Sequence, residues 1–148
     1  NSEDYNFALS DVETNCDQEV LDKWTIKNSK IEYWIPGKEI NKLSKIETLQ
    51  FIGGVFSAIP KNISINTLQI NPNFYIDGNS KITTDENEKF IKESEFEVIA
   101  FDSSFFVVQS ESITIHKNIM EKYQNACDIQ NENRLWFKYI EDKSRFMK

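Results

Sequence analysis

Three side chains in this sequence have the chemistry of a nucleophilic site, namely Cys16, Cys127 and His116, the only histidine. A cysteine nucleophile needs a neighbouring base that removes its proton, and an imidazole is the usual base. On one continuous helix, His116 and Cys127 would lie about 16 Å apart along the axis, so the two side chains cannot pair within a helix. Pairing of Cys16 with His116 stays open. Because His116 lies beside Lys117 near a predicted helix start, we interpret it as a surface residue.

Two groups of neighbouring carboxylates have the composition of a metal site or of a glycosidase acid and base. They are Glu86 with Glu88, and Glu93 with Glu95 and Glu97. Calcium loops require an ordered D-x-D-x-D-G pattern that is missing here, and hydrolytic carboxylates carry no local signature in this chain. Glu95 and Glu97 would share one face of a strand, since strand side chains alternate. We interpret both groups as solvated acidic surface, and we predict no metal, no cofactor and no enzymatic activity.

Two further stretches contain residues that occur in catalytic loops. Gly53-Gly54 follows an apolar run, as a phosphate-binding loop would, but neither G-x-x-x-x-G-K-S/T nor G-x-G-x-x-G occurs. We therefore expect a bend or bulge within a strand at these glycines. Asp102-Ser103-Ser104 lacks the flanking glycines of a nucleophile elbow, and we interpret it as a turn capped by the aspartate.

The charge of the chain limits its partners. With 24 acidic and 17 basic residues the net charge is −7, which opposes binding to nucleic acid because that binding depends on Lys and Arg. A basic protein partner fits this charge. The candidate contact residues are acidic: Asp11, Glu13, Asp85, Glu86, Glu88, Glu93 and Glu95. No apolar run approaches the roughly 20 residues of a membrane span, so no membrane partner is expected.

The elements that would position these residues are organised around a hairpin. Residues 96–101 and 105–108 are the densest apolar runs of the chain and are separated by the polar turn at residues 102–104. Because both runs are nearly continuous, both faces should be shielded from water, and we predict that this hairpin forms the middle of a sheet.

Other strands and helices follow from apolar spacing and from turn residues. We expect strands at residues 5–9, 24–27, 31–35, 49–59 and 135–140, with one or two more within residues 60–77. We expect helices at residues 38–48, at 85–94 and from 112 or 114 to 128. The second of these helices would bury Phe90 and Ile91, and the third would lie across the sheet.

Together these elements predict one α+β domain over residues 1–148. Its sheet is single, twisted and mostly antiparallel, is built from hairpins, and has two or three helices packed on it. Residues 1–18 are expected to form a flexible start and residues 141–148 a charged tail. Its length of 148 residues is enough for a core that needs neither a disulfide nor a metal.

Several short motifs between residues 83 and 145 follow one another in a familiar order. They are Phe90-Ile91-Lys92-Glu93-Ser94, Asp102-Ser103, Phe105-Phe106-Val107-Val108, Tyr123-Gln124-Asn125-Ala126 and Asp142-Lys143-Ser144-Arg145, with Trp24-Thr25-Ile26 and Ala58-Ile59-Pro60 upstream. This order resembles a family of small uncharacterised bacterial proteins from low-GC organisms. The match is one of pattern over about half of the chain, and it carries over no functional residue.

In composition, an acidic single domain rich in Ile, Asn, Lys and Glu resembles the immunity proteins encoded beside bacterial toxins, including those of contact-dependent inhibition systems. This resemblance implies a cytoplasmic protein that binds and neutralises a cognate toxin domain without catalysis. The alternative is an exported or accessory domain that binds a ligand or protein. In that alternative Cys16 and Cys127 form a disulfide, whereas two buried free thiols are expected inside the cell.

Overall fold

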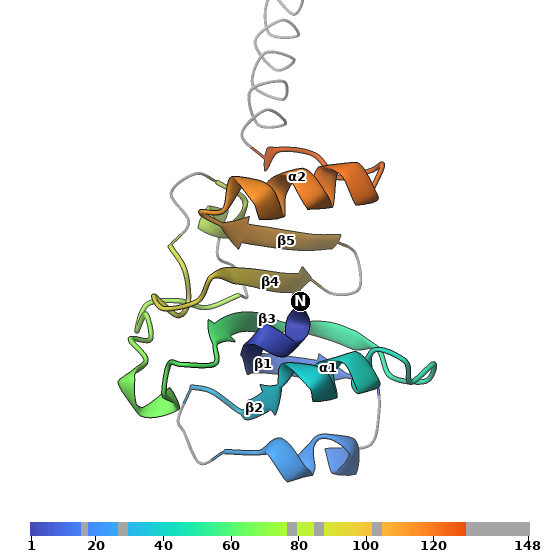
Figure 1. The fold of residues 1–148 in the computed structure, drawn as a ribbon, viewed down its shortest axis with the longest axis vertical. Helices are drawn as coiled ribbons and strands as arrows, with labels where there is room; N and C mark the ends of the chain where they lie inside the picture. The colour runs from blue at the N-terminus through green and yellow to red at the C-terminus, as the bar shows by residue number, and fades with distance from the viewer. Residues whose placement is uncertain (16–17, 27–29, 77–79, 85–87, 102–104, 130–148) are drawn as a thin grey trace, which may run out of the picture.

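The fold, obtained as a computed structural model, is described for residues 1–15, 18–26, 30–76, 80–84, 88–101 and 105–129. Its centre is a five-stranded sheet in the order β2-β1-β3-β4-β5, with every neighbouring pair antiparallel (Figure 1). The strands are β1 (Tyr5–Thr14), β2 (Tyr33–Pro36), β3 (Phe51–Pro60), β4 (Phe96–Phe101) and β5 (Phe105–Ser110). The predicted α+β class with a single antiparallel sheet is confirmed.

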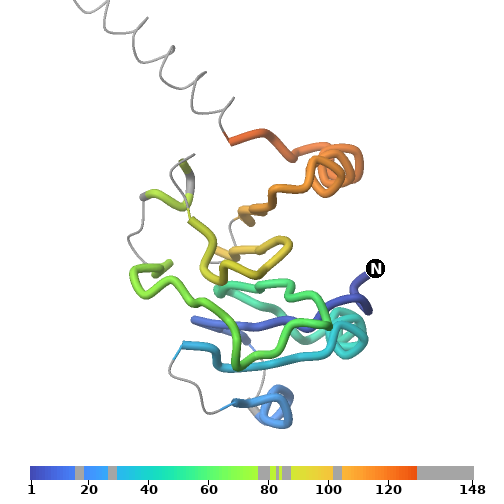
Figure 2. The backbone as a smooth tube through the Cα atoms, turned by 60° about the vertical axis from the view of Figure 1, so that its left-hand side comes forward, coloured from blue at the N-terminus to red at the C-terminus, as the bar shows by residue number. Residues whose placement is uncertain are grey.

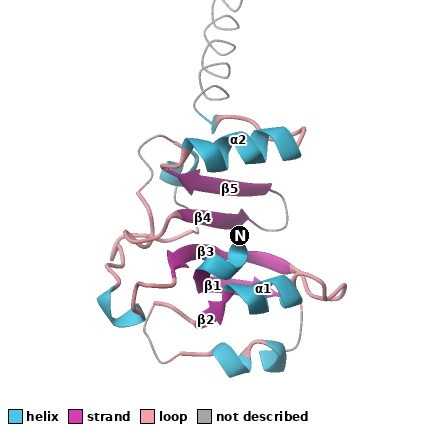
Figure 3. Ribbon diagram, in the orientation of Figure 1, coloured by secondary structure: helices cyan, strands magenta, loops and turns pink. Residues whose placement is uncertain are grey.

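Helical residues are few. The two α-helices are α1 (Gly37–Leu43) and α2 (Ile113–Lys122), with 3-10 turns η1 (Ser2–Asp4), η2 (Gln18–Val20), η3 (Asp22–Trp24), η4 (Ile65–Thr67) and η5 (Ser80–Thr83). Helix α1 packs over the part of the sheet formed by β1 and β2, and α2 lies beside β5 (Figure 3). Both α-helices occupy predicted positions. Helix α2 begins after Ser112, whose hydroxyl accepts the N–H of Ile115, but it ends at Lys122 because Tyr123 is extended. The predicted ends, residue 48 for α1 and residue 128 for α2, are both wrong.

Two apolar clusters cover opposite faces of the sheet, since alternate side chains of each strand point to opposite sides. The first contains Ala8, Val55, Ile99 and Val107 of the strands, and it is covered by the connection between β3 and β4 (Figure 2). Phe74, Ile82, Phe90 and Ile91 are the buried residues that this connection contributes. The second cluster contains Phe7, Leu9, Ile35 and Ala58, and it is covered by Leu43 of α1 and by Leu21.

The Gly53-Gly54 pair lies opposite a bulge, as the sequence predicted. The register of β1 against β3 shifts between Ser10 and Glu13, and again before Thr14. Asp11 has a φ of 51° and Gly54 a φ of 138°, so Gly54 holds a backbone conformation that favours glycine. The extra residues of the bulge belong to β1, which therefore extends from Tyr5 through Thr14. Much of the stretch expected as a flexible start thus supplies a strand between β2 and β3.

The hairpin at residues 96–110 is confirmed, but its predicted place in the middle of the sheet is wrong. The middle strand is β3, and β5 lies at the sheet edge. The prediction assumed that a continuous apolar run must be shielded on both faces. In β5 that assumption does not hold, because the side chains of Phe105 and Phe106 are 47% and 65% exposed.

Other expected elements differ from the structure. The strand at residues 24–27 is replaced by η3 and a single bridge from Thr25 to Tyr33, and the described part of residues 60–77 contains η4 and the bridge Ile70–Ile91 in place of strands. Residues 88–94 form no helix, although Phe90 and Ile91 are buried as predicted. The strand expected at residues 135–140 and the tail at 141–148 lie outside the described residues.

Gly37 begins α1 where η1 packs against it, and this contact tests the fold. A Cβ at Gly37 would overlap the carbonyl group of Ser2, whereas a Cβ at Gly53 would lie 3.8 Å from its nearest atom. Because a backbone carbonyl cannot rotate away, Gly37→Ala should lower the free energy of unfolding by about 1–3 kcal/mol. The control Gly53→Ala should change it by about 0.5 kcal/mol or less. Chemical denaturation measures both, and equal effects would contradict this packing.

Candidate protein-binding site

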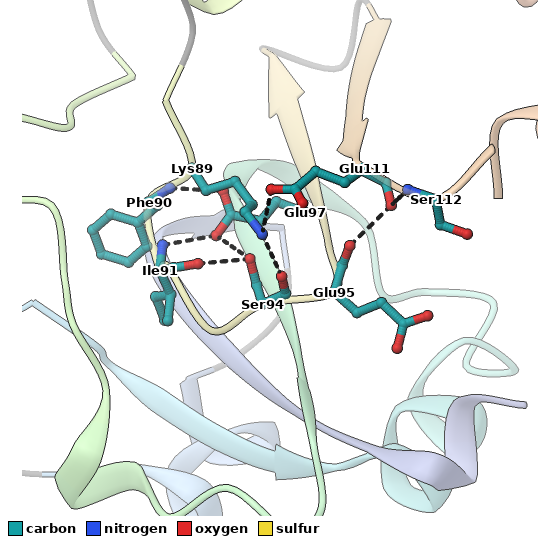
Figure 4. Close-up of polar contacts among 9 residues, drawn as sticks. Lys89, Phe90, Ile91, Ser94, Glu95, Glu97, Glu111 and Ser112 are labelled. Atoms are coloured by element: carbon teal, nitrogen blue, oxygen red, sulfur yellow. Dashed lines mark hydrogen bonds and ion pairs between the residues drawn. The ribbon is translucent and has the colours of Figure 1, made fainter.

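Glu97 of β4 is a glutamate with no exposed surface, and its carboxylate joins two strands and a loop (Figure 4). Its Oε1 accepts the N–H of Ile91 at 2.8 Å and the hydroxyl of Ser57 at 2.7 Å, while Oε2 accepts the N–H of Phe90 at 2.8 Å. The hydroxyl of Ser94 lies 3.1 Å from Oε1 and 2.7 Å from the carbonyl oxygen of Ile91. Both carboxylate oxygens therefore have partners.

The sheet itself brings Glu97 and Ser57 together. Ser57 of β3 is the register partner of Glu97, and both side chains point to the face of the first apolar cluster. On that face the neighbours along β3 and β4 are apolar, so the carboxylate has little access to water. Without these donors its burial would be strongly unfavourable. The hydrogen bonds explain why a charged residue type is accommodated inside this core.

The carboxylate determines the path of residues 88–95, here called the acidic segment. Two consecutive N–H groups of this segment bond to Glu97, and the carbonyl of Phe90 accepts the N–H of Asn71 at 2.8 Å. The N–H of Lys92 donates to the carbonyl of Gln69 at 3.1 Å. The segment is therefore held from one side by β4 and from the other by residues 69–71. The N–H groups of Phe90, Ile91 and Lys92 are thus bonded to acceptors outside the segment, which is why the helix predicted at 85–94 does not form in residues 88–94.

Burial raises the pKa of Glu97 above its usual range, because water no longer solvates the charged form. The donors from Ile91, Ser57, Phe90 and Ser94 act in the opposite direction and offset part of that rise. A raised pKa in the folded state means that ionisation of Glu97 disfavours folding. Its contribution to stability is thus fully present below the pKa of the unfolded chain and is lost as the pH rises through the folded pKa.

Lys89 links the beginning of the acidic segment to its end. Its ammonium donates to the carbonyl oxygen of Ser94 at 2.7 Å and lies 3.6 Å from the carboxylate of Glu111, as Figure 4 shows. Its side chain is mostly buried, whereas the side chain of Glu111 is 90% exposed. Because one partner is so exposed, we assign this ion pair little energy. The hydrogen bond to Ser94 is the contact that fixes the lysine.

Three of the predicted contact residues lie together on the acidic segment. Glu88 and Glu95 are exposed and Glu93 is half-buried. The carboxylate of Glu93 accepts the N–H of Gln69 at 2.8 Å, and that of Glu88 accepts the side-chain amide of Asn71 at 3.2 Å. An open hollow of about 760 Å³ lies between residues 69–73, the start of the segment and the end of β5. The segment therefore presents fixed carboxylates next to a concave surface.

The other predicted contact residues are not part of this surface. Asp11 and Glu13 are exposed at the bulge of β1, opposite Gly53. Tyr5 at the start of β1 bonds to Glu95 and pairs with Pro60, whereas Glu13 pairs with Gly53; these partners are seven residues apart on β3, so the two groups are about 23 Å apart. Asp85 and Glu86 lie outside the described residues. The predicted acidic set thus divides into at least two separate groups.

Glu95 is anchored by an aromatic cluster at the start of β1. Burial, and then the hydrogen bond to Glu95, raise the pKa of Tyr5 to about 12, because both favour the neutral phenol. The Tyr5 ring lies edge-on to Phe96 and Phe7, with ring centroids 5.6 and 6.4 Å away. The carboxylate of Glu95 is therefore held at a defined place on the surface although it is exposed.

His116 and Cys127 both line an apolar groove between β5 and α2, here called the β5–α2 groove. Both border the same groove because α2 ends at Lys122 and residues 125–129 also line it. No hydrogen bond joins the two side chains in the described part of the chain, and Cys127 is a free, exposed thiol, not a buried one as predicted. Cys16 lies outside that part, so its pairing with His116 stays untested.

Sequence reasoning missed the role of Glu97, which it placed on a solvated acidic face. A usable signal was present. Glu97 interrupts one apolar run and Ser57 interrupts another, and two polar residues inside paired apolar strands must satisfy each other if both are buried. The donors from Phe90 and Ile91 gave no such signal, since backbone groups are not distinguished by residue type.

Comparison with protein-family models, with curated proteins and with solved structures found no match. Within the described residues, no three side chains of His, Cys, Asp or Glu are grouped so as to hold a metal ion. The same residues include no helix with both the length and the hydropathy of a membrane span. The functional interpretation therefore depends on the geometry of the acidic segment.

The variant Glu97→Gln tests the role of the buried carboxylate. An amide nitrogen cannot accept the N–H that one carboxylate oxygen accepts, so we expect the free energy of unfolding to fall by about 1–3 kcal/mol. The difference from wild type should shrink as the pH rises from the usual carboxyl range through the raised pKa of Glu97, because only the wild type is destabilised by its ionisation.

Urea denaturation at a series of pH values measures this difference. The matched control is Glu95→Gln, two positions away and exposed, whose amide oxygen can still accept from Tyr5 and which should change stability little. Equal effects of the two variants, or a difference that grows with pH, would contradict the assignment.

Proposed function

We propose that this protein is an immunity protein, which binds a cognate bacterial toxin domain and neutralises it by covering its basic surface. The observation that carries the proposal is the acidic segment. Three carboxylates, those of Glu88, Glu93 and Glu95, stand on a backbone that is fixed from below by Glu97 and from the side by residues 69–71. A surface that is ordered before binding loses little conformational entropy when the partner binds.

The charge of the whole chain supports a basic partner. A net charge of −7 attracts a cationic protein at long range, and fixed carboxylates then define how the two proteins dock. Toxins that act on nucleic acid must present Lys and Arg to phosphate groups, so they carry the complementary charge. The segment also contains Lys89 and Lys92, but Lys89 is bound to the carbonyl of Ser94. On this proposal the protein acts in the cytoplasm and catalyses no reaction.

The alternative of an exported or accessory binding domain rests on a disulfide between Cys16 and Cys127. The free thiol of Cys127 gives that disulfide no support. The acidic segment would serve a binding role in either case. We therefore retain the toxin-neutralising function as the proposal.

The proposal predicts a defined effect of charge removal on association. The partner to use is the protein encoded directly before this chain, because an immunity gene follows its toxin gene. The triple variant Glu88→Gln, Glu93→Gln and Glu95→Gln keeps the oxygens that accept from Asn71 and Gln69 but removes three charges. Its association rate at low salt should be about tenfold or more below that of the wild type, with a flatter salt dependence.

Stopped-flow mixing at several salt concentrations measures these rates. The control is Asp11→Asn with Glu13→Gln, which removes two charges at the other end of β1 and should have a much smaller effect. Equal slowing by both variants would show that only net charge matters. The immunity function itself is excluded if the upstream protein neither binds this chain nor loses its toxicity in its presence.

A further inference from the structure

The outer strand of the sheet and the helix beside it carry most of the large apolar side chains that reach the surface. Among the described residues seven such side chains are exposed, and five of them lie on β5, on α2 or directly after α2. They are Phe105, Phe106, Ile113, Met120 and Tyr123, here called the apolar edge. Because exposed apolar residues are normally scattered singly, a group of this kind marks an interaction surface.

The members of the apolar edge form one surface. Phe105, Phe106 and Met120 all line the β5–α2 groove, which has a volume of about 790 Å³. Ile113 precedes Met120 by almost two helical turns, so the two side chains lie on the same side of α2. Tyr123 is the first residue after the helix. The apolar edge therefore extends along the whole of α2 and across the strand next to it (Figure 1).

Helix α2 has little support within the described part of its own chain. No residue of α2 is buried, and neither apolar cluster of the core includes one. A helix of ten residues is marginal in water unless its apolar side packs against another surface. A contact made through Ile113 and Met120 would supply that packing.

We propose that the apolar edge is the interface through which two copies of this chain associate about a two-fold axis. The first argument is charge. Residues 105–127 contain two acidic and two basic side chains, so the net charge of −7 is carried entirely by the rest of the chain. Two copies repel each other over most of their surfaces, and this neutral region is where they can approach. A basic partner would gain no electrostatic attraction here.

The second argument is area. The residues of the apolar edge are between 47% and 70% exposed. A large apolar residue has roughly 200 Å² of surface when fully exposed, so together the five expose about 550 Å². A stable interface of standard size buries about 800 Å² on each partner. These five residues alone therefore supply most of the area that a dimer needs.

The third argument is self-complementarity, since a two-fold contact places a surface against a copy of itself. Lys117 and Glu121 are exposed one helical turn apart on α2, and in the described part of the chain neither forms an ion pair. Two antiparallel α2 helices that cross close to Met120 place Lys117 of each copy opposite Glu121 of the other. The same arrangement directs Ile113 toward Tyr123 of the other copy.

Sedimentation equilibrium of the full chain, over a range of protein and salt concentrations, measures this association. We expect twice the chain mass at high protein concentration and tighter association as the salt concentration rises, because salt screens the repulsion between two acidic molecules. Electrostatic capture of a basic toxin has the opposite salt dependence. The test needs no toxin, so its outcome is independent of the proposed function.

The variant Ile113→Asp places a charge in the apolar edge and should weaken the association by about tenfold or more. It should still fold, because Ile113 is 70% exposed and an acidic residue is favourable in the first turn of a helix. The matched control is Ile46→Asp, which adds the same charge at an exposed position outside the apolar edge and should leave the association unchanged. Circular dichroism verifies that both variants fold.

A charge exchange tests the two-fold arrangement. Lys117→Glu alone should weaken the association, because it places two acidic groups opposite each other twice in the interface, and adding Glu121→Lys should restore it. A chain that stays monomeric at every concentration would overturn the proposal and leave the apolar edge to a different protein. Equal effects of Ile113→Asp and Ile46→Asp, or a double variant as weak as Lys117→Glu, would also overturn it.

Discussion

The structure depends most on one buried carboxyl group that the core must accommodate. Glu97 is placed by β4 among apolar neighbours, and it is acceptable there because Ser57 and two backbone N–H groups donate to it. Those N–H groups belong to Phe90 and Ile91, whose side chains fill the first apolar cluster. A single carboxylate thus links the sheet to the loop that covers it. Removal of its oxygens leaves buried donors without acceptors, which is more costly than loss of one surface hydrogen bond.

Within the short stretch from Glu95 to Glu97, one carboxyl group has a structural role and the other lies on the surface. Glu97 is buried and bonded on both oxygens, whereas Glu95, two residues earlier, is exposed and held by Tyr5. The buried carboxylate fixes the backbone, and the exposed carboxylates of the acidic segment are the groups that a partner can reach. The two apolar clusters shield both faces of the sheet from water, and the segment is attached to the first of them through Phe90 and Ile91. Along the edge strand β5 and on α2, large apolar side chains are exposed without such a polar framework.

The sequence predicted the elements that depend on local patterns. Alternating and continuous apolar runs located β3, β4 and β5, and the spacing from Ile115 to Tyr123 located α2. The predictions were wrong where the interaction that determines the structure joins residues that are far apart in the sequence, or where it uses backbone groups that every residue type has. Residues 88–94 have helical spacing, but the N–H groups of Phe90 and Ile91 bond to Glu97, and no periodicity in the sequence reveals that choice. The order of the strands could not be predicted either. The many apolar residues of β5 suggested a central strand, but β5 lies at the edge of the sheet and part of its apolar surface is exposed.

In the candidate site, the negative charges of Glu88, Glu93 and Glu95 could be predicted from the sequence. Their separation from Asp11 and Glu13 could not, because it depends on the path of β1.

Amide hydrogen exchange at Phe90 and Ile91 tests the central claim most directly, since these are the two N–H groups that donate to Glu97. Both belong to a connection without regular secondary structure, where amides usually exchange by local opening. If the buried carboxylate holds them as described, their exchange under native conditions should be as slow as that of Val55 and Ile99, which are paired in the centre of the sheet. Exchange at the fast rate of an exposed loop amide would contradict the account.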